Sequence, residues 1–221
     1  MLAGILAPSR ADAGPEVDHW PAEDEARAMV ARLLATGRAT ISNEKIAKDR
    51  YGRRVGSVII VRTDGAPPLW VEKAMIEAGA ARVAPRPGER ACYALLLEAE
   101  RVARQLGIGL WANPAYAVRD AGETRALFAR SGRLQLIEGV VRRVTRRRTH
   151  VFIDFGGDWK RDTTSVIARK LLKDGSGVER DLGPLEGRRI RVRGWVERRY
   201  GPSVDLAAYE AIEILDGEVE K

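Results

Sequence analysis

Met1-Leu2-Ala3-Gly4-Ile5-Leu6-Ala7-Pro8-Ser9 is the stretch on which the interpretation of the first half of the chain depends. It is apolar up to its proline, which cannot donate a hydrogen bond to a neighbouring strand, so residues 1–8 are predicted to form a short strand. The polar residues 9–20 are predicted to form a loop. A helix should then run from Pro21 to Gly37, because acidic residues occupy its first turn and apolar residues recur at three- and four-residue spacing.

Outward from this helix, the pattern up to residue 111 alternates between strands, turns and helices. Short apolar runs beside polar turns predict strands, and longer runs with helical periodicity that end near glycine predict helices. The expected elements are, in chain order, a strand over 38–46, a turn over Lys48–Arg54, a strand over 55–62, helices over about Leu69 to Ala78 and Ala91 to Leu106, and an irregular segment over 80–90 between them.

These pieces resemble the staphylococcal nuclease (thermonuclease) family over the first 111 residues. The resemblance is carried, in order, by Leu2–Pro8, Glu25–Arg27, Asp49-Arg-Tyr-Gly-Arg53, Glu77–Val83, Tyr93 with Glu98–Glu100, and Gly109-Leu-Trp111. It implies an α+β fold, an OB-type β-barrel with three helices. Because the family's opening strands would precede Met1, the chain as given is expected to hold an incomplete barrel with exposed strand edges.

Members of this family hydrolyse phosphodiester bonds with one calcium ion, a glutamate that activates water, and two arginines that neutralise developing charge. The resemblance puts Met1 at the position of the first arginine, Leu6 at that of a calcium aspartate and Ser9 at that of the glutamate. Leucine has no oxygen for calcium, and a serine hydroxyl is a poor base near neutral pH. The implied protein is therefore a nuclease homologue that is inactive as written and holds no calcium, although the sequence leaves open whether any catalysis remains.

Only the second catalytic arginine of the family persists, at Arg53. Arg50 and Tyr51 stand beside it as candidate contacts for a phosphate or a base. An equally good interpretation is that Arg53 is a turn residue that faces solvent.

Beyond residue 111 the pattern of polar and apolar residues changes. The polar residues 112–131 predict a linker, and 132–217 then alternate as short strands. Five strands with one helix between the third and the fourth is the order of an OB-fold, so a second OB-fold-like barrel is predicted, with an unrelated small antiparallel sheet as the alternative. The expected strands are 134–146, 150–156, 162–168, 188–198 and 203–214, with a short helix around 168–173. The predicted domains are thus 1–111 and 132–217.

The charge of the chain favours a polyanionic partner. It has 38 Lys and Arg against 31 Asp and Glu, a net charge of +7. In the predicted second barrel, Arg146, Arg147 and Arg148 fall in the loop between strands 1 and 2, and Arg198 and Arg199 in the loop between strands 4 and 5. These two loops flank the binding groove of OB-folds, so single-stranded nucleic acid is the predicted partner. The aromatic residues that interleave with the basic ones are Phe152, Phe155, Trp159, Trp195 and Tyr200.

Trp195 is the aromatic residue that the pattern places most clearly. It alternates onto the same side of its strand as Arg191 and Arg193, so it is predicted to be a surface platform for a base. Phe152 could lie on either face. The alternative is that the tryptophan is core and the arginines form a solvated face.

The composition of the chain argues against several classes of functional site. Cys92 is the only cysteine, which excludes an internal disulfide and a cysteine-based zinc site, and two histidines make other His-based sites improbable. The aspartates of segment 154–162 lack a calcium-loop pattern and are expected to form a turn network with Lys160 and Arg161. No apolar run approaches the ~20 residues of a membrane span. The start lacks the basic region of a signal peptide, so a cytoplasmic protein is predicted as written, and an extracytoplasmic one if a signal peptide precedes Met1.

Three functions stay open from the sequence. The first is a non-catalytic nucleic-acid-binding protein. The second is an active calcium-dependent nuclease whose upstream residues are restored. The third is a protein-interaction scaffold, in which a protein partner covers the open barrel.

Overall fold

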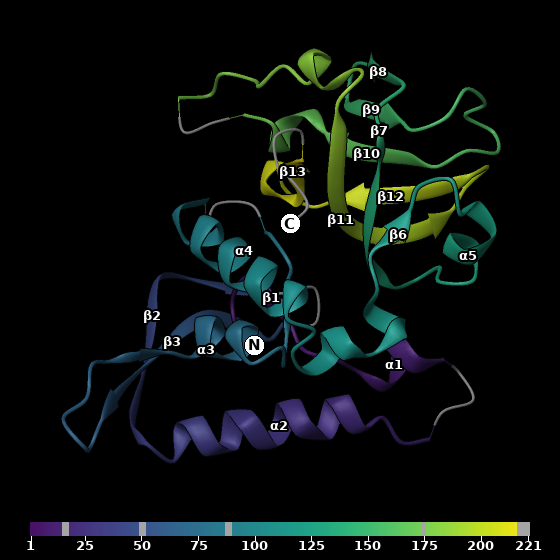
Figure 1. The fold of residues 1–221 in the computed structure, drawn as a ribbon. Helices are drawn as coiled ribbons and strands as arrows, with labels where there is room; N and C mark the ends of the chain where they lie inside the picture. The colour runs from purple at the N-terminus through teal and green to yellow at the C-terminus, as the bar shows by residue number, and fades with distance from the viewer. Residues whose placement is uncertain (15–17, 49–51, 87–89, 174–175, 216–221) are drawn as a thin grey trace. The chain divides into compact units, whose positions relative to one another are not determined.

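The computed structural model describes residues 1–14, 18–48, 52–86, 90–173 and 176–215. In these residues the chain is a mixed α+β protein with five α-helices and several sheets, one of which has eight strands. It divides into an N-terminal unit, Met1–Ala84 with Glu89–Ala115, and a C-terminal unit, Pro85–Gly88 with Tyr116–Lys221 (Figure 1). Each unit has its own hydrophobic core.

Two small antiparallel sheets and four α-helices are the main elements of the described part of the N-terminal unit, and the 3-10 helix Gly109–Ala112 follows them. One sheet has the order β2-β3-β4, and the other pairs β1 with β5. The described strands of this unit therefore fall into two sheets, and a bridge between Leu2 and Gly56 links the residues before β1 to the β2-β3-β4 sheet. The elements are β1 (Ile5–Leu6), α1 (Arg10–Ala13), α2 (Pro21–Leu34), β2 (Gly37–Lys48), β3 (Arg54–Arg62), β4 (Leu69–Trp70), α3 (Val71–Glu77), β5 (Arg82–Val83) and α4 (Arg90–Gln105).

Three predictions for this unit need correction. The predicted loop 9–20 contains α1, because Ser9 and Asp12 form a capping box that starts the helix. The predicted second helix begins later, since Leu69–Trp70 pair with β3 as β4. The predicted irregular segment 80–90 includes β5, which pairs with β1. Local propensity did not indicate the two short strands, because long-range pairing stabilises them.

Buried carboxylates hold the N-terminal elements together. Asp12 of α1 and Arg82 of β5 form an almost fully buried ion pair at 3.0 Å. Glu72 of α3 accepts a hydrogen bond from the backbone amide of Val58 in β3 at 3.1 Å. Burial raises the pKa of Glu72, and the hydrogen bonds that it accepts oppose that change. These contacts tie α1 to β5 and α3 to β3.

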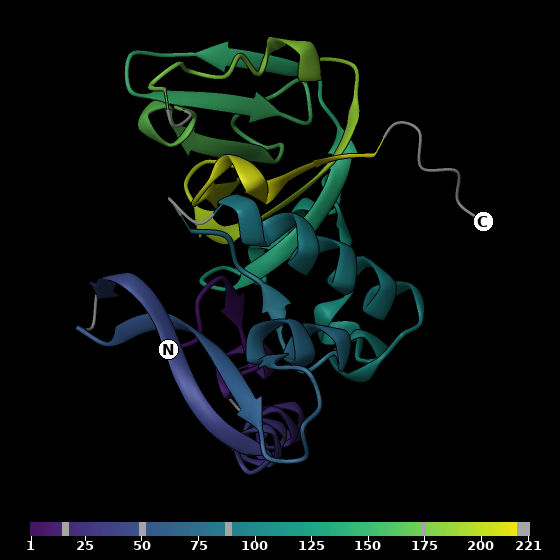
Figure 2. The same ribbon diagram turned by 90° about the vertical axis from the view of Figure 1, so that its left-hand side faces the viewer.

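The C-terminal unit is built on the eight-stranded sheet (Figure 1 and Figure 2). Its strands pair in the order β6-β7-β11-β12-β10-β9-β8, and β13 pairs with β11. Only two of these pairings, β10 with β12 and β6 with β7, are parallel. The strands are β6 (Arg119–Asp120), β7 (Leu134–Val140), β8 (Arg143–Arg146), β9 (His150–Asp154), β10 (Thr164–Ala168), β11 (Arg189–Arg198), β12 (Pro202–Leu206) and β13 (Ile212–Ile214).

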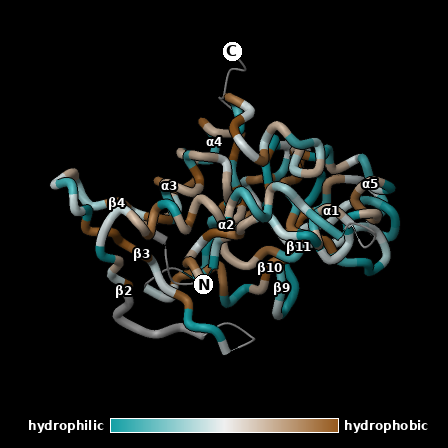
Figure 3. Tube along the Cα trace, turned by 90° about the horizontal axis from the view of Figure 1, so that it is seen from below, coloured by the Kyte–Doolittle hydropathy of each residue, from teal (hydrophilic) through white to brown (hydrophobic). Residues whose placement is uncertain are grey.

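Alternating apolar residues of these strands face one core. Figure 3 shows the hydrophobic residues along β10, and likewise along β3 of the other unit. Gly194 in β11 allows a close approach between strands, because a Cβ there would lie 2.5 Å from the Asp205 carbonyl oxygen. The fully buried residues of this core include Leu127, Ile137, Ile153, Ile167, Val192 and Val204.

Each predicted strand region of this unit contains a strand, but two of the predicted strands are broken in the middle. The predicted strand 134–146 is interrupted at Val141–Arg142 between β7 and β8, and 203–214 is split between β12 and β13. The predicted helix after the third strand is a single 3-10 turn, Arg169–Leu171. The segment 112–131 contains β6 and α5 (Thr124–Phe128), and its Leu127 is fully buried in the core of this unit.

Candidate nucleic-acid interface

The positions that the resemblance assigned to calcium and to the general base carry structural contacts instead. Leu6 lies in β1 and pairs with Arg82. Ser9 directs both its backbone amide, at 3.0 Å, and its hydroxyl, at 3.5 Å, to the Asp12 carboxylate. That carboxylate is already paired with Arg82. Among the residues that the structure describes, no three His, Cys, Asp or Glu side chains gather to hold a metal ion. Because leucine offers no oxygen, the residues present do not fit a calcium ion here.

Of the three residues predicted around the remaining catalytic arginine, the structure describes only Arg53. Arg53 is exposed and directly follows Gly52, which has a positive φ of 75°. Arg50 and Tyr51 lie outside the described residues. A role for these three residues in binding a phosphate or a base stays a prediction.

A pocket of about 400 Å³ lies in the C-terminal unit. Its floor is the outer face of four neighbouring strands, β8, β9, β10 and β12, and its walls are the β9–β10 loop and the β11–β12 turn. The lining residues are Arg143, Thr145, Arg147, Phe152, Asp154, Trp159, Asp162, Thr164, Val166, Arg199, Tyr200, Gly201, Pro202 and Ser203.

Strand register arranges the floor in two rows. The first row crosses the strands as Arg143, Asp154, Thr164 and Ser203, each paired with the next. The second row, one pleat along, crosses as Thr145, Phe152 and Val166. A polar row thus lies beside a mainly apolar one, which is a surface suited to a flat ring with a polar edge.

Hydrogen bonds between neighbouring residues satisfy most of the side chains of the polar row. The Asp154 carboxylate accepts from the Arg143 guanidinium at 3.3 Å and from the Thr164 hydroxyl at 2.9 Å. Ser203 is only 5% exposed, and its hydroxyl has no hydrogen-bond partner among the described residues. Buried hydroxyls normally find a partner, so Ser203 is a candidate ligand contact at the end of this row.

Aromatic side chains form the wall where the two loops meet. Trp159 of the β9–β10 loop packs edge-on against Tyr200 of the β11–β12 turn, with ring centroids 5.0 Å apart and planes at 78°. The Lys160 ammonium lies 5.7 Å from the centroid of the Trp159 ring. Beneath them, the Asp162 carboxylate accepts from the Asp158 amide at 2.8 Å, within the turn network that the sequence predicts.

Three arginines line this pocket, and their charges are not equally available. Arg143 is paired with Asp154, and Arg199 donates to both carboxylate oxygens of Asp205, at 3.1 and 2.9 Å. Burial raises the pKa of Asp205, while Arg199 acts in the opposite direction. The exposed Arg147 guanidinium has no carboxylate or other hydrogen-bond partner in the described part of the chain. Arg147 is therefore the cation best placed to take a phosphate oxygen.

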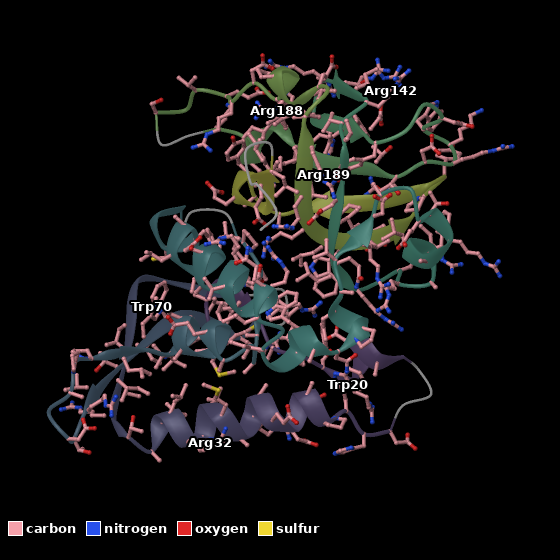
Figure 4. The ribbon with its side chains drawn as sticks, viewed as in Figure 1. Trp20, Arg32, Trp70, Arg142, Arg188 and Arg189 are labelled. Atoms are coloured by element: carbon pink, nitrogen blue, oxygen red, sulfur yellow. The ribbon has the colours of Figure 1, made fainter. Side chains whose placement is uncertain are left out.

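Of the other arginines predicted for the interface, two make structural contacts. Arg146 pairs with Glu179 at 3.0 Å, a carboxylate whose pKa is lowered mainly by its hydrogen bond with Arg169. Arg198 donates to the Phe128 carbonyl and the Ser131 hydroxyl, which ties β11 to α5 and the residues after it. Arg148 is exposed but does not line the pocket. Arg142, beside β8, is also exposed and points away from the strands (Figure 4).

Trp195 lies at the surface, 41% exposed, and outside the pocket. The arginines on its side of β11 are buried and paired with carboxylates. Arg191 pairs with Glu138 and Glu213, and the fully buried Arg193 side chain pairs with Glu213. This face of β11 is an ion-pair network.

The sequence did not assign several pocket residues to the site, namely Asp154, Asp162, Thr164, Phe152, Trp159, Tyr200 and Ser203. Alternation along β9 indicated that Phe152 faces opposite to Val151 and Ile153, but not which face was core. The interleaving of aromatic and basic residues was a usable signal for Trp159 and Tyr200. Ser203 had none, because its place depends on the parallel pairing of β10 with β12.

Comparison with known proteins bears on the first half of the chain. A family model described as staphylococcal nuclease homologue matches residues 1–113. Comparison with curated proteins gives no match. None of the helices in the described ranges is long and apolar enough to cross a membrane. Since the matched region is half of the sequence, the chain belongs to the staphylococcal nuclease homologue family.

Proposed function

We propose that this chain is a nucleic-acid-binding member of its family that does not cleave by the calcium mechanism, and that an OB-type barrel in the C-terminal unit carries the binding surface. One observation carries the proposal. A pocket on the outer face of β8, β9, β10 and β12 combines arginine and aromatic side chains. Arginines bind phosphates, and aromatic faces stack bases.

The strand order supports an OB-type barrel. If β7 and β8, which are separated only by Val141–Arg142, count as one bent first strand, the pairing order runs 1-4-5-3-2-1 and returns to its start. The parallel pairing of β10 with β12 then joins strands 3 and 5. OB-folds bind oligonucleotides on strands 2 and 3 between the 1–2 and 4–5 loops. The pocket occupies that face, with Arg147 after β8 and Arg199 after β11.

A single strand fits this surface better than a duplex. The aromatic rings of Phe152, Trp159 and Tyr200 need a base face to contact, and the bases of a duplex are stacked on one another.

The expected domain limits are those predicted from sequence, 1–111 for the nuclease-like domain and 132–217 for the barrel. The segment 119–128 would accompany the barrel, because Leu127 packs in its core.

The residues at the former catalytic positions support the absence of hydrolysis. A hydrocarbon side chain at Leu6 cannot polarise a phosphate through a metal, and Ser9 is engaged with Asp12. Loss of a general base alone typically slows such reactions by about 10²–10⁴-fold. Leu6 and Ser9 stand at these positions whatever the rest of the protein contains, so an active nuclease is the weaker alternative.

A protein-interaction scaffold is the second candidate function. It is the weaker candidate, because the exposed apolar side chains of Ile41 and Val61 (68% and 54% exposed) lie on opposite faces of the β2–β3 sheet and form no shared patch. Single exposed apolar residues are common at protein surfaces.

The test uses the full chain and a labelled single-stranded oligonucleotide. We expect binding that weakens steeply as salt is raised, and weaker binding to a duplex of the same sequence. We also expect no cleavage above background with or without calcium. Cleavage that a calcium chelator abolishes would overturn the catalytic part, and absence of binding at low salt would overturn the binding part.

A further inference from the structure

We infer that the pocket holds a single nucleobase, unstacked from its neighbours, and that the strand does not stack continuously along this face; this rests on the proposed function. The base would lie against Phe152 with its phosphate at Arg147. The sugar-phosphate chain on either side would stay outside the pocket.

The wall between the two loops closes the pocket on one side. Gly201 of the β11–β12 turn packs directly on the β9–β10 loop, because a Cβ there would lie 2.2 Å from the Asp162 carbonyl oxygen. Above this backbone contact, the Trp159 and Tyr200 rings meet edge to face. A strand that stacked base after base along the sheet would have to pass through this contact. The contact between the two loops therefore blocks continuous stacking past this side of the pocket.

The size and chemistry of the pocket agree with one base. About 400 Å³ is at the small end of the ~300–1,000 Å³ typical of small-ligand sites, so the pocket suits a ligand of nucleotide size and not an extended oligonucleotide. Phe152 supplies the apolar face in the middle of the floor, between Thr145 and Val166. The polar row beside it supplies acceptors and hydroxyls for a base edge, including the Ser203 hydroxyl that has no partner among the described residues.

The charges are arranged to keep phosphate at the rim. Asp154 and Asp162 line the pocket and disfavour an anion inside it. Arg143, which could offset them, is held by Asp154. Arg147 lies beyond the end of β8, is exposed and has no partner in the described ranges, so the phosphate of the bound nucleotide would meet it there.

The experiment compares three single-stranded oligonucleotides of equal length by anisotropy with the full chain. One has every base, one is abasic except for a central base, and one is fully abasic. A single-base pocket predicts that the central base restores most of the affinity lost in the abasic strand. Affinity that rises in step with the number of bases would overturn the inference in favour of continuous stacking. Equal affinity for all three strands would also overturn it, but would leave the proposed function standing. No binding to any strand would refute the proposed function itself.

Variants then locate the base. Phe152→Ala should remove the gain from the central base, by about tenfold, and leave the affinity for the abasic strand unchanged. Phe152→Leu keeps the apolar bulk without the ring, so it tests the same point if the alanine variant is unstable. Ser203→Ala should reduce the gain by less. If both Phe152 variants fold and keep the full gain, the base does not bind here.

Discussion

Replacing Arg147 with alanine should remove one phosphate contact from the nucleic-acid complex. Arg147 lines the pocket and follows Arg143 and Thr145 on the outer side of the β8 chain segment. Its guanidinium has no ion-pair partner within the described residues, so its charge is available to the ligand. Each phosphate contact on a single strand contributes about 0.7 to the slope of log affinity against log salt. The slope of the Arg147→Ala variant should therefore be smaller by about 0.7, which corresponds to a wild-type advantage that grows about fivefold for each tenfold decrease in salt.

The neighbouring arginines provide matched controls. Arg148→Ala removes the same charge from the next residue, which is exposed but outside the pocket, so its slope should stay that of the wild type. Replacing Arg146, Arg147 and Arg148 together should lower the slope by about 0.7 and not by the roughly 2 expected of three available arginines, because Arg146 is paired with Glu179 and Arg148 lies outside the pocket.

Anisotropy titrations over a salt series measure these slopes, and thermal melting shows that each variant is folded. A folded Arg147→Ala variant with the wild-type slope would refute the assignment of this residue to the phosphate. A larger change for Arg148→Ala than for Arg147→Ala would show that the loop binds the strand and the pocket does not.

Three further predictions concern other parts of the C-terminal unit. Glu213→Gln should destabilise it toward the lower end of ~3–5 kcal/mol, because the fully buried Arg193 loses a charged partner that is itself 18% exposed. Glu197→Gln, at an exposed position near the end of β11, is the control in chemical denaturation and should change the stability by no more than about 0.5 kcal/mol. Trp195→Ala should leave oligonucleotide affinity unchanged in the same anisotropy assay, since Trp195 lies outside the pocket, and a loss of affinity with an unchanged salt slope would instead place a base on it. The Arg169 hydrogen bond lowers the pKa of Glu179 below its ordinary value of 4.5. The stabilisation from this carboxylate should therefore be complete above about pH 4.5 and be lost as the pH falls through the lowered pKa. Glu179→Gln should flatten that part of the profile of melting temperature against pH, and an unchanged profile would contradict the assignment.

Much of the fold could be predicted because its signals are local. Helical periodicity and terminal residues indicated α2, α3 and α4, and period-two alternation indicated the centres of β7 to β12. The family resemblance rested on short motifs in a given order, which a sequence carries directly. The losses at Leu6 and Ser9 were visible for the same reason, since a missing oxygen ligand or base is a property of the residue and not of its surroundings.

The site itself depended on contacts between residues far apart in the chain. Thr164 and Ser203 are neighbours only because β10 and β12 pair in parallel, and Trp159 meets Tyr200 only where two loops converge. The sequence likewise did not show which arginine has a charge that is available to a ligand. Arg146, Arg147 and Arg148 are equivalent as a run, yet one pairs with Glu179 and another lines the pocket, because the fold brings a carboxylate to one and not to the other. The sequence by itself determined the family, the longer helices and strands, and the basic character of the chain, since these follow from motif order, local periodicity and composition. Only the tertiary structure decided which cations and rings share one surface, because that depends on strand register and on which partner neutralises each charge.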